Sequence, residues 1–193
     1  IAEGRGYSIG DAHLYRPTAL KAPVYPLFLA GIHKISAPND TILAAIIQHL
    51  LLNLSPILLY HLLRRHLSNQ PSLYAATFFA VHPSYFVYPS TLESTSLFIP
   101  ICLLWLLVLQ RFHDEVQRHN SKRLPAVVAI MSTIVILCQP ISTPVVIILV
   151  VSATRTQRER LFIALLAMLC MMPWALRNYA TFGRIIALKS PVW

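Results

Sequence analysis

Basic and aromatic side chains gather in residues 173–184, whose sequence is PWALRNYATFGR. Arg177 and Arg184 carry fixed positive charge, and Trp174 and Tyr179 are of the type that sits between lipid tails and headgroups. A guanidinium group binds phosphate oxygens through paired, parallel hydrogen bonds. The segment therefore predicts contacts with a phosphate at the membrane surface, made either to a lipid-linked substrate or to ordinary lipid headgroups.

Other basic residues lie in segments expected on the same side of the membrane. Lys21 precedes an apolar stretch, and its ammonium group meets a phosphate as a point charge. We interpret Lys21, Arg177 and Arg184 as contacts to the phosphate of a donor substrate. Contact with lipid headgroups alone is the alternative, and it also covers Arg16 and Lys189.

Glu93 is the acidic residue with the most informative position, because it stands just before an apolar stretch near the expected membrane surface. Its carboxylate either binds substrate hydroxyls and orients an acceptor, or it stabilises the positive N-terminal end of the following helix. The outward segments of the sequence hold no carboxylates spaced at i, i+3 or i+4. A glycosidase pair of carboxylates is therefore not indicated.

Polar residues also occur inside a long apolar stretch, at Gln48, His49 and Asn53, with the last two on one helix face. They either line a cavity or form hydrogen bonds between neighbouring helices, and the second interpretation is favoured.

Motifs for nucleotide and metal chemistry are missing from the sequence, which has no P-loop, no Rossmann fingerprint and no HExxH. Cys102, Cys138 and Cys170 are widely spaced within apolar stretches, which favours buried, unreactive thiols over a metal site or a disulfide framework. We therefore expect no metal and no cofactor. An enzyme of this kind would use a donor that is already activated and linked to a lipid.

The composition indicates an integral membrane protein. Of the 193 residues, 56% are hydrophobic and 12% are charged, whereas soluble domains carry about 25% charged residues. A helix that crosses a bilayer needs roughly 17–25 apolar residues, and the longest apolar stretches reach that length. The net charge of +9 comes largely from short loops, so we expect contacts with membrane lipids and not with nucleic acid.

The predicted fold is all-α, with about six transmembrane or half-spanning helices and a short interfacial helix at residues 24–35. The Pro173-Trp174 pair is expected to end the last helix, and residues 110–123 are expected to form a charged connector. The six predicted segments are residues 41–63, 73–88, 94–109, 124–138, 143–153 and 161–174.

The distribution of basic residues predicts the orientation. If the helices alternate, the loops at residues 64–72, 110–123 and 154–160 share one side and hold 9 of the 16 lysines and arginines. That side is expected to be cytoplasmic, so both ends of the chain face away from the cytoplasm. We expect a multi-pass protein of the cell membrane, most simply a bacterial inner membrane.

One membrane domain accounts for residues 1–193. It comprises an outward loop with the interfacial helix at residues 1–40, membrane helices at 41–174 and an outward segment at 175–193.

Three parts of the sequence resemble polytopic glycosyltransferases of the GT-C fold. The match is to the family-39-like group, which includes the dolichyl-phosphate-mannose protein mannosyltransferases and the aminoarabinose transferases of lipid A. The first part is IAEGRGYS with PTALKAPVYPLFLAGI, the second is FAVHPSYFVYPSTLESTSLF, and the third and most specific is PWALRNYATFGRIIALKS. They occur in the family's order and at compatible spacing.

The resemblance implies transfer of a sugar from a polyprenyl-phosphate donor to an outward-facing acceptor, a lipid or protein glycan. It also implies a general base, an Asp in the first outward loop upstream of IAEGRGYS. The sequence begins after that position, so the catalytic residue stays unassigned, Asp11 is not given the role, and the chain resembles a fragment cut at both ends. The residues expected to bind substrate are Lys21, Tyr25, Glu93, Arg177 and Arg184.

The sequence departs from the family pattern at Lys21-Ala22-Pro23-Val24-Tyr25, where many relatives have Arg-Pro-Pro-Gly-Tyr. Two other hypotheses follow: a non-enzymatic membrane protein, such as a transporter or flippase component, and an inactive remnant of a glycosyltransferase. A transporter places ionisable residues at the midplane of its helices. Here the acidic residues, lysines and arginines lie in the loops, which favours chemistry at the membrane surface.

Overall fold

The computed structural model describes residues 8–9, 16–35, 41–83, 85, 87, 91–117 and 124–189. This part of the chain is helical apart from two short antiparallel strands, β1 (Ser8–Ile9) and β2 (Arg16–Pro17). The predicted all-α class is thus confirmed. The helices in chain order are α1 (Val24–Ile35), α2 (Thr41–Asn53), α3 (Ser55–Leu63), α4 (Asn69–Ala80), α6 (Thr95–Gln117), α7 (Leu124–Cys138), the 3₁₀ turn η1 (Pro140–Ser142), α8 (Thr143–Ala153) and α9 (Gln157–Phe182).

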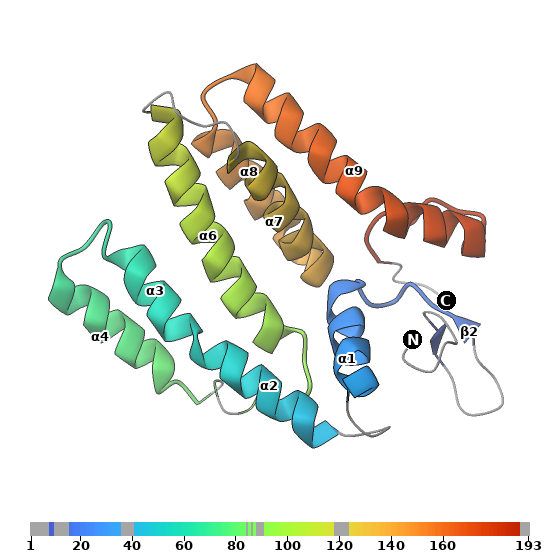
Figure 1. The fold of residues 1–193 in the computed structure, drawn as a ribbon, viewed down its shortest axis with the longest axis horizontal. Coiled ribbons are helices and arrows are strands. Elements are labelled where there is room, and N and C mark those ends of the chain that lie inside the picture. Colours follow the sequence, from blue (N-terminus) through green and yellow to red (C-terminus); the bar gives the residue numbers. More distant parts are fainter. Residues whose placement is uncertain are drawn as a thin grey trace.

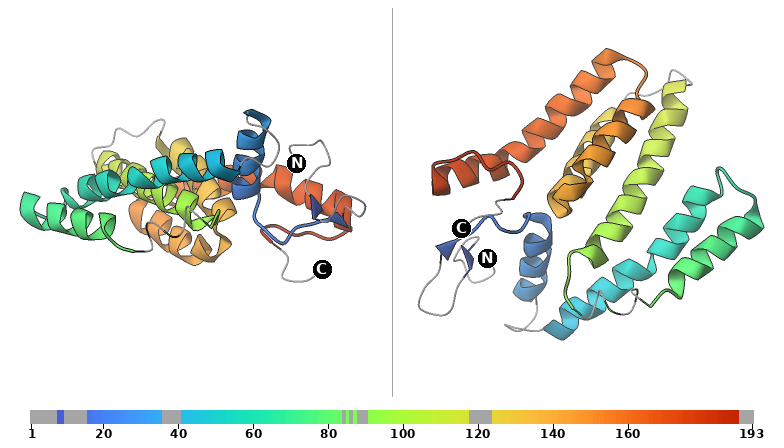
Figure 2. Two further views of the ribbon diagram at one scale, coloured as in Figure 1. Left: turned by 90° about the horizontal axis from the view of Figure 1, so that it is seen from below. Right: turned by 180° about the vertical axis from the view of Figure 1, so that it is seen from behind.

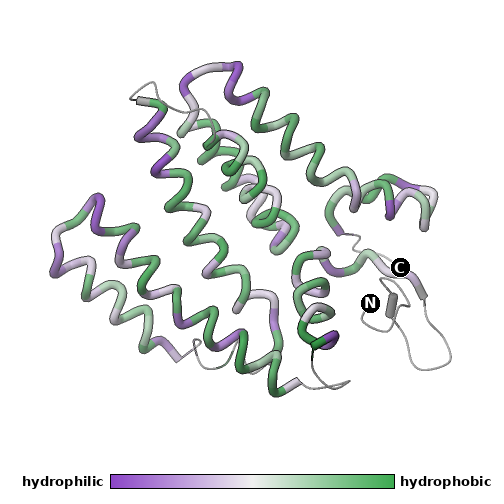
Figure 3. Tube along the Cα trace, in the orientation of Figure 1, coloured by the Kyte–Doolittle hydropathy of each residue, from purple (hydrophilic) through white to green (hydrophobic). Residues whose placement is uncertain are grey.

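Three helical stretches of the described residues are long and apolar enough to cross a membrane by length and composition: Thr41–Leu63, Thr95–Val116 and Gln157–Phe182. The apolar helices α1, α7 and η1–α8 are shorter. Figure 3 shows apolar residues along the middle of the long helices and polar residues toward their ends, as a bilayer requires. The chain is a membrane protein that combines long and half-length helices.

The helix ends gather at two opposite ends of the molecule. The α3–α4 connection, the C-terminal end of α6 and the start of α9 lie toward the upper left of Figure 1, and α1, β2 and the C-terminal end of α9 lie toward the lower right. Figure 2 shows the same grouping from behind. We call the first the basic end, because Arg64, Arg65, Arg155, Arg158 and Arg160 belong to it, and the second the α1 end.

The predicted span at Thr41–Leu63 is interrupted between α2 and α3 at Leu54. Pro56 lies in the first turn of α3 and has no N–H, so it cannot donate to the carbonyl of Leu52 four residues earlier. The hydroxyl of Tyr85 donates to that carbonyl instead. A side chain distant in sequence thus completes the hydrogen bonding of a proline-broken helix.

The predicted span at residues 73–88 is wrong in length, because α4 occupies Asn69–Ala80. Val81 closes the helix, and Pro83 disfavours helical geometry at His82 before it. Ser84, Phe86 and Tyr88 of the predicted span lie outside the described residues.

The predicted connector at residues 110–123 is also wrong in part, because α6 continues to Gln117. Phe112 and Val116 continue the spacing of Trp105 and Leu109, so all four share one helix face, and all four are buried. Packing therefore extends the helix beyond its apolar stretch.

The prediction that Pro173-Trp174 ends the last helix is wrong. Helix α9 begins at Gln157 after a capping box of Thr156 and Glu159, and Pro173 lies inside it. A proline inside a helix removes one backbone hydrogen bond and bends the axis, and α9 changes direction toward its C-terminal end in Figure 1. The helix ends at Gly183, whose φ of 64° suits a residue without Cβ.

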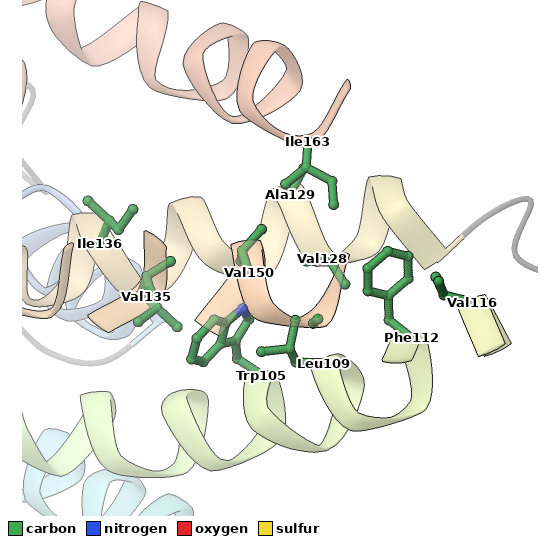
Figure 4. Packing of buried hydrophobic residues seen from close by; sticks show 12 residues of the cluster. Trp105, Leu109, Phe112, Val116, Val128, Ala129, Val135, Ile136, Val150 and Ile163 are labelled. Atoms are coloured by element: carbon green, nitrogen blue, oxygen red, sulfur yellow. The ribbon is translucent and has the colours of Figure 1, made fainter. Parts of the chain in front are cut away.

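The main core lies between α6, α7, α8 and the start of α9 (Figure 4). The Trp105 indole packs in this core and donates from Nε1 to Ser132 Oγ on α7 at 2.9 Å. Valines and small residues of α7 let the helices approach closely, as in membrane helix packing. This core fixes α7 and α9, which in turn hold the α1 end.

Candidate functional site

Arg177 joins the end of α9 to the segment that precedes α1. Its Nη1 donates to the carbonyl oxygen of Thr18 at 2.9 Å and to Asn178 Oδ1 at 2.8 Å. The guanidinium carbon also lies 5.3 Å from the Trp174 ring centroid and 5.5 Å from that of Phe182, within the range of cation–π attraction. Arg177 is therefore a fixed, partly buried cation.

The chain folds back after α9 and is held against the helix. Trp174 Nε1 donates to the carbonyl of Leu188 at 2.9 Å, and Asn178 Nδ2 donates to that of Ile186 at 2.8 Å. The buried side chains of Ala19, Leu137 and Trp174 form a cluster beneath this turn. Trp174 is thus buried and hydrogen-bonded, and it does not have the exposure expected of an aromatic residue at the membrane boundary. Of the two predicted boundary aromatics, Tyr179 has that exposure, with 56% of its surface accessible.

Tyr25 on α1 is buried and accepts a hydrogen bond from Gln48 Nε2 on α2 at 2.9 Å. Gln48 is fully buried, so it links two helices as the favoured interpretation expects. His49 does not, because its Nδ1 lies 2.9 Å from the carbonyl oxygen of Ala45 on the same helix, and Asn53 is exposed.

Burial raises the pKa of Tyr25 above its ordinary value of 10, the Gln48 hydrogen bond partly opposes this, and the negative charge of Glu93 raises it further. Tyr25 therefore stays protonated at neutral pH, and the charge of Glu93 contributes to its raised pKa.

Glu93 stands two residues before α6 and is exposed. Its backbone carbonyl accepts a hydrogen bond from Ser96 Oγ at 2.7 Å, in the first turn of α6. Leu92 before it has a φ of 51°, a left-handed conformation that a non-glycine residue rarely adopts. Such local strain is concentrated at functional sites.

Lys21 and Arg184 are both exposed, the first in the segment before α1 and the second in the turn after Gly183. Lys21 lies three residues after Thr18, which Arg177 holds. Within the described part of the chain, the Arg184 side chain makes no hydrogen bond or ion pair. A guanidinium group has five N–H donors, and no described side chain or backbone group takes one up here.

The two halves of the site meet at Val24. This residue packs against the cluster of Ala19, Leu137 and Trp174, and also against the neighbouring cluster of Tyr25, Leu97 and Cys138. The segment before α1, the start of α6 and the end of α9 therefore converge at the α1 end. Of the other residues considered from the sequence, Asp11 and the Arg16 side chain lie outside the described part of the chain.

Sequence reasoning missed two residues that build this site. Thr18 takes part through its carbonyl oxygen, which no side-chain pattern reveals. Asn178 accepts a hydrogen bond from Arg177 and donates one to the carbonyl of Ile186 in the returning chain. Its only signal in the sequence is a polar residue in a segment expected at the membrane boundary.

The letters GYSIG at residues 6–10 match the G-x-S-x-G pattern of serine hydrolases. That motif works only where the Ser sits between a strand and a helix of an α/β sheet. Here Ser8 belongs to a two-residue strand paired with Arg16–Pro17, and the other regular elements of the described residues are helices. The match carries no hydrolase chemistry.

Lys21, Glu93, Arg177 and Arg184 belong to the three segments that converge near Val24. Across the described residues, no group of three or more His, Cys, Asp or Glu side chains is close enough to hold a metal ion.

No curated protein and no solved structure matches the chain. The sequence model described as "Dolichyl-phosphate-mannose-protein mannosyltransferase" matches residues 20–176, which include Lys21, Tyr25 and Glu93 and stop one residue before Arg177. Because the match covers most of the 193 residues, the chain belongs to the dolichyl-phosphate-mannose-protein mannosyltransferase family, a family of membrane glycosyltransferases.

Proposed function

We propose that this protein moves a sugar from a polyprenyl-phosphate donor to an acceptor on the extracytoplasmic side of the membrane. The α1 end binds the donor, and the acceptor is a lipid or protein glycan. Lys21, Arg177 and Arg184 supply positive charge for the donor phosphate, and Tyr25 and Glu93 organise the sugar or the acceptor.

One observation carries this proposal: residues far apart in the sequence converge around Val24. The family match supports the reaction class, and the convergence supports the place. A lipid-linked donor presents its phosphate at the membrane surface, where the polar ends of apolar helices also lie.

The three cations have different surroundings, which divides their roles. Arg177 is occupied by Thr18 and Asn178 and lies over two aromatic rings. It therefore holds the segment that carries Lys21 in place and adds positive potential. Arg184 is exposed and has no partner among the described residues. It is therefore the residue best able to bind a phosphate through two hydrogen bonds.

The orientation follows from the positive-inside rule. The basic end faces the cytoplasm and the α1 end faces outward in this proposal. A protease added to the outside of intact cells is then expected to cut the exposed turn at residues 183–187 and to spare residues 64–68.

A transfer assay tests the proposal directly. Membranes containing the full-length protein are supplied with radiolabelled polyprenyl-phosphate mannose, and label in endogenous lipids and proteins is counted. Arg184→Ala should lower transfer about tenfold or more, since hydrogen bonds to charged groups are worth roughly 1.5–3 kcal/mol. Arg184→Lys should retain part of the rate.

The matched control is Arg158→Ala, which removes an exposed arginine at the basic end. Its transfer rate should equal that of the wild type. Equal rates for Arg184→Ala and Arg158→Ala would remove Arg184 from the donor site. Absence of label transfer by the wild type, from mannose or other polyprenyl-phosphate sugars, would refute the proposed reaction.

A further inference from the structure

The turn between α7 and α8 lies at the α1 end. Figures 1 and 2 show the C-terminal end of α7 beside α1, and the two helices contact each other. Leu137 belongs to the buried cluster with Trp174, and Cys138 belongs to the cluster with Tyr25. Gln139 is the next residue of the chain, so it directly follows side chains that pack into both halves of the site.

A proline shapes this turn and ends α7. The residue before a proline is driven out of helical geometry, and Gln139, which precedes Pro140, is extended with a φ of −140° and a ψ of 94°. The carbonyl oxygen of Gln139 accepts hydrogen bonds from the backbone N–H of Ser142 at 3.0 Å and from its Oγ at 2.7 Å. Thr143 Oγ1 donates to the carbonyl of Pro140 at 2.7 Å. These bonds fix the backbone of the turn and occupy both hydroxyl groups.

The side-chain amide of Gln139 is unpaired and accessible. Gln139 is half-buried and its amide makes no hydrogen bond within the described part of the chain. The unpaired amide oxygens of Gln48 and Gln110 have no accessible surface, whereas the amide of Gln139 does. An amide has two N–H donors and an acceptor oxygen. It can therefore bind two neighbouring hydroxyl groups, one as donor and one as acceptor.

The end of α7 adds further acceptors beside this amide. The last carbonyl groups of a helix have no partner within it, and those of Ile136, Leu137 and Cys138 accept no hydrogen bond from a described residue. They also carry the partial negative charge of the helix C-terminus. This charge favours hydroxyl groups as donors and disfavours a phosphate.

We propose that Gln139 and the end of α7 bind the hydroxyl groups of the donor sugar, an inference that rests on the proposed function. Lys21 and Arg184 attract the phosphate of the donor. The neutral amide, beside the negative end of α7, binds the uncharged sugar. Gln139 thus determines specificity for the sugar and carries no step of the transfer.

The position of the turn favours the donor sugar over an acceptor glycan, which also carries hydroxyl groups. In a glycosyl phosphate the sugar is bonded directly to the phosphate, so the two must bind side by side. Leu137 packs against Ala19, two residues before Lys21, and against Trp174, three residues before Arg177. The end of α7 therefore adjoins the two segments that supply positive charge.

Binding of the donor in the absence of acceptor tests the proposal. The full-length protein in mild detergent is titrated with polyprenyl phosphate and with its mannosyl and glucosyl forms, and native mass spectrometry measures the bound fraction. The wild type should bind a glycosylated lipid more tightly than the sugar-free lipid. Gln139→Leu should lower that affinity about five- to tenfold, as expected for one or two lost hydrogen bonds. Its affinity for sugar-free polyprenyl phosphate should stay unchanged.

Gln157→Leu is the matched control, because it makes the same change at an exposed glutamine in the first turn of α9, at the basic end. Its affinity for all three lipids should equal that of the wild type. Gln139→Leu should also unfold at the wild-type temperature, since the amide has no partner within the described chain. Gln139→Ala removes the amide without adding an apolar group, and it decides the matter if Gln139→Leu fails to fold.

Three results would each overturn the role of Gln139. They are a wild type that binds glycosylated and sugar-free lipids equally, an equal loss of affinity for both in Gln139→Leu, and unchanged affinities in that variant. In the last case a raised KM for the acceptor would assign the amide to the acceptor glycan. A wild type that binds none of the three lipids would instead refute the donor site itself, so the two proposals fail separately.

Discussion

Arg177 donates from Nη1 to the carbonyl oxygen of Thr18 at 2.9 Å, across 159 positions of the chain. This bond closes the α1 end, because Thr18 precedes the segment with Lys21 and Tyr25, whereas Arg177 belongs to the last helix. Both bonds come from Nη1, while the guanidinium plane lies near the Trp174 and Phe182 rings, and a compact lysine ammonium cannot make these two kinds of contact from the same position.

Replacement of Arg177 should therefore affect both stability and transfer. Arg177→Lys keeps the charge and should still lower the unfolding free energy in detergent by about 1–3 kcal/mol, the cost of unmade hydrogen bonds to a charged group. Arg177→Gln should lose the charge as well and transfer less sugar than Arg177→Lys. Thermal unfolding and the radiolabel assay measure the two effects. A Lys variant as stable as the wild type would show that the hydrogen bonds of Arg177 to Thr18 and Asn178 do not stabilise the protein.

The Tyr25–Gln48 hydrogen bond links α1 to α2 and can be measured with a double-mutant cycle. Tyr25→Phe and Gln48→Leu should each destabilise the protein, and the double variant should lose less than the sum of the two. The expected coupling is about 0.5–1.5 kcal/mol. Additive losses would show that the two side chains act independently.

The contribution of the Tyr85 hydroxyl to the free energy of unfolding should depend on the proline at position 56. Tyr85→Phe leaves the Leu52 carbonyl without its donor and should cost about 1–3 kcal/mol, the penalty for an unsatisfied buried acceptor. Pro56→Ala restores the missing backbone N–H, so in that background Tyr85→Phe should cost clearly less. Unfolding in a denaturing detergent gives the four free energies. An equal cost of Tyr85→Phe in both backgrounds would contradict the compensation.

The same substitution at two glycines should have opposite signs. A Cβ at Gly183 or at Gly31 would meet no atom within 4 Å, but Gly183 has a φ of +64°. Gly183→Ala should destabilise by about 1–2 kcal/mol, because L-residues are strained in that conformation. Gly31→Ala, inside α1, should stabilise by about 0.5–1 kcal/mol. Melting temperatures that move in the same direction would show that backbone strain does not decide the effect at Gly183.

The sequence by itself determined the fold class, the membrane setting and the family. A bilayer requires long apolar helices whatever their partners, so the stretch at Thr41–Leu63 is recognisable from composition alone. Helix α1 was also predictable from its own short apolar sequence, and its predicted bounds agree with the structure. Charged loops are equally visible in the sequence, because a charge avoids the bilayer interior wherever the chain goes.

Only the tertiary structure decided where helices stop and which polar groups meet. Packing of Phe112 and Val116 extends α6 beyond its apolar stretch, and α9 continues through Pro173 because the chain beyond it is held by Trp174 and Asn178. Arg177 reaches a backbone carbonyl, and Tyr85 replaces a hydrogen bond that Pro56 removes. Such contacts depend on partners far away in the chain, and the pattern of side chains around each residue does not encode them.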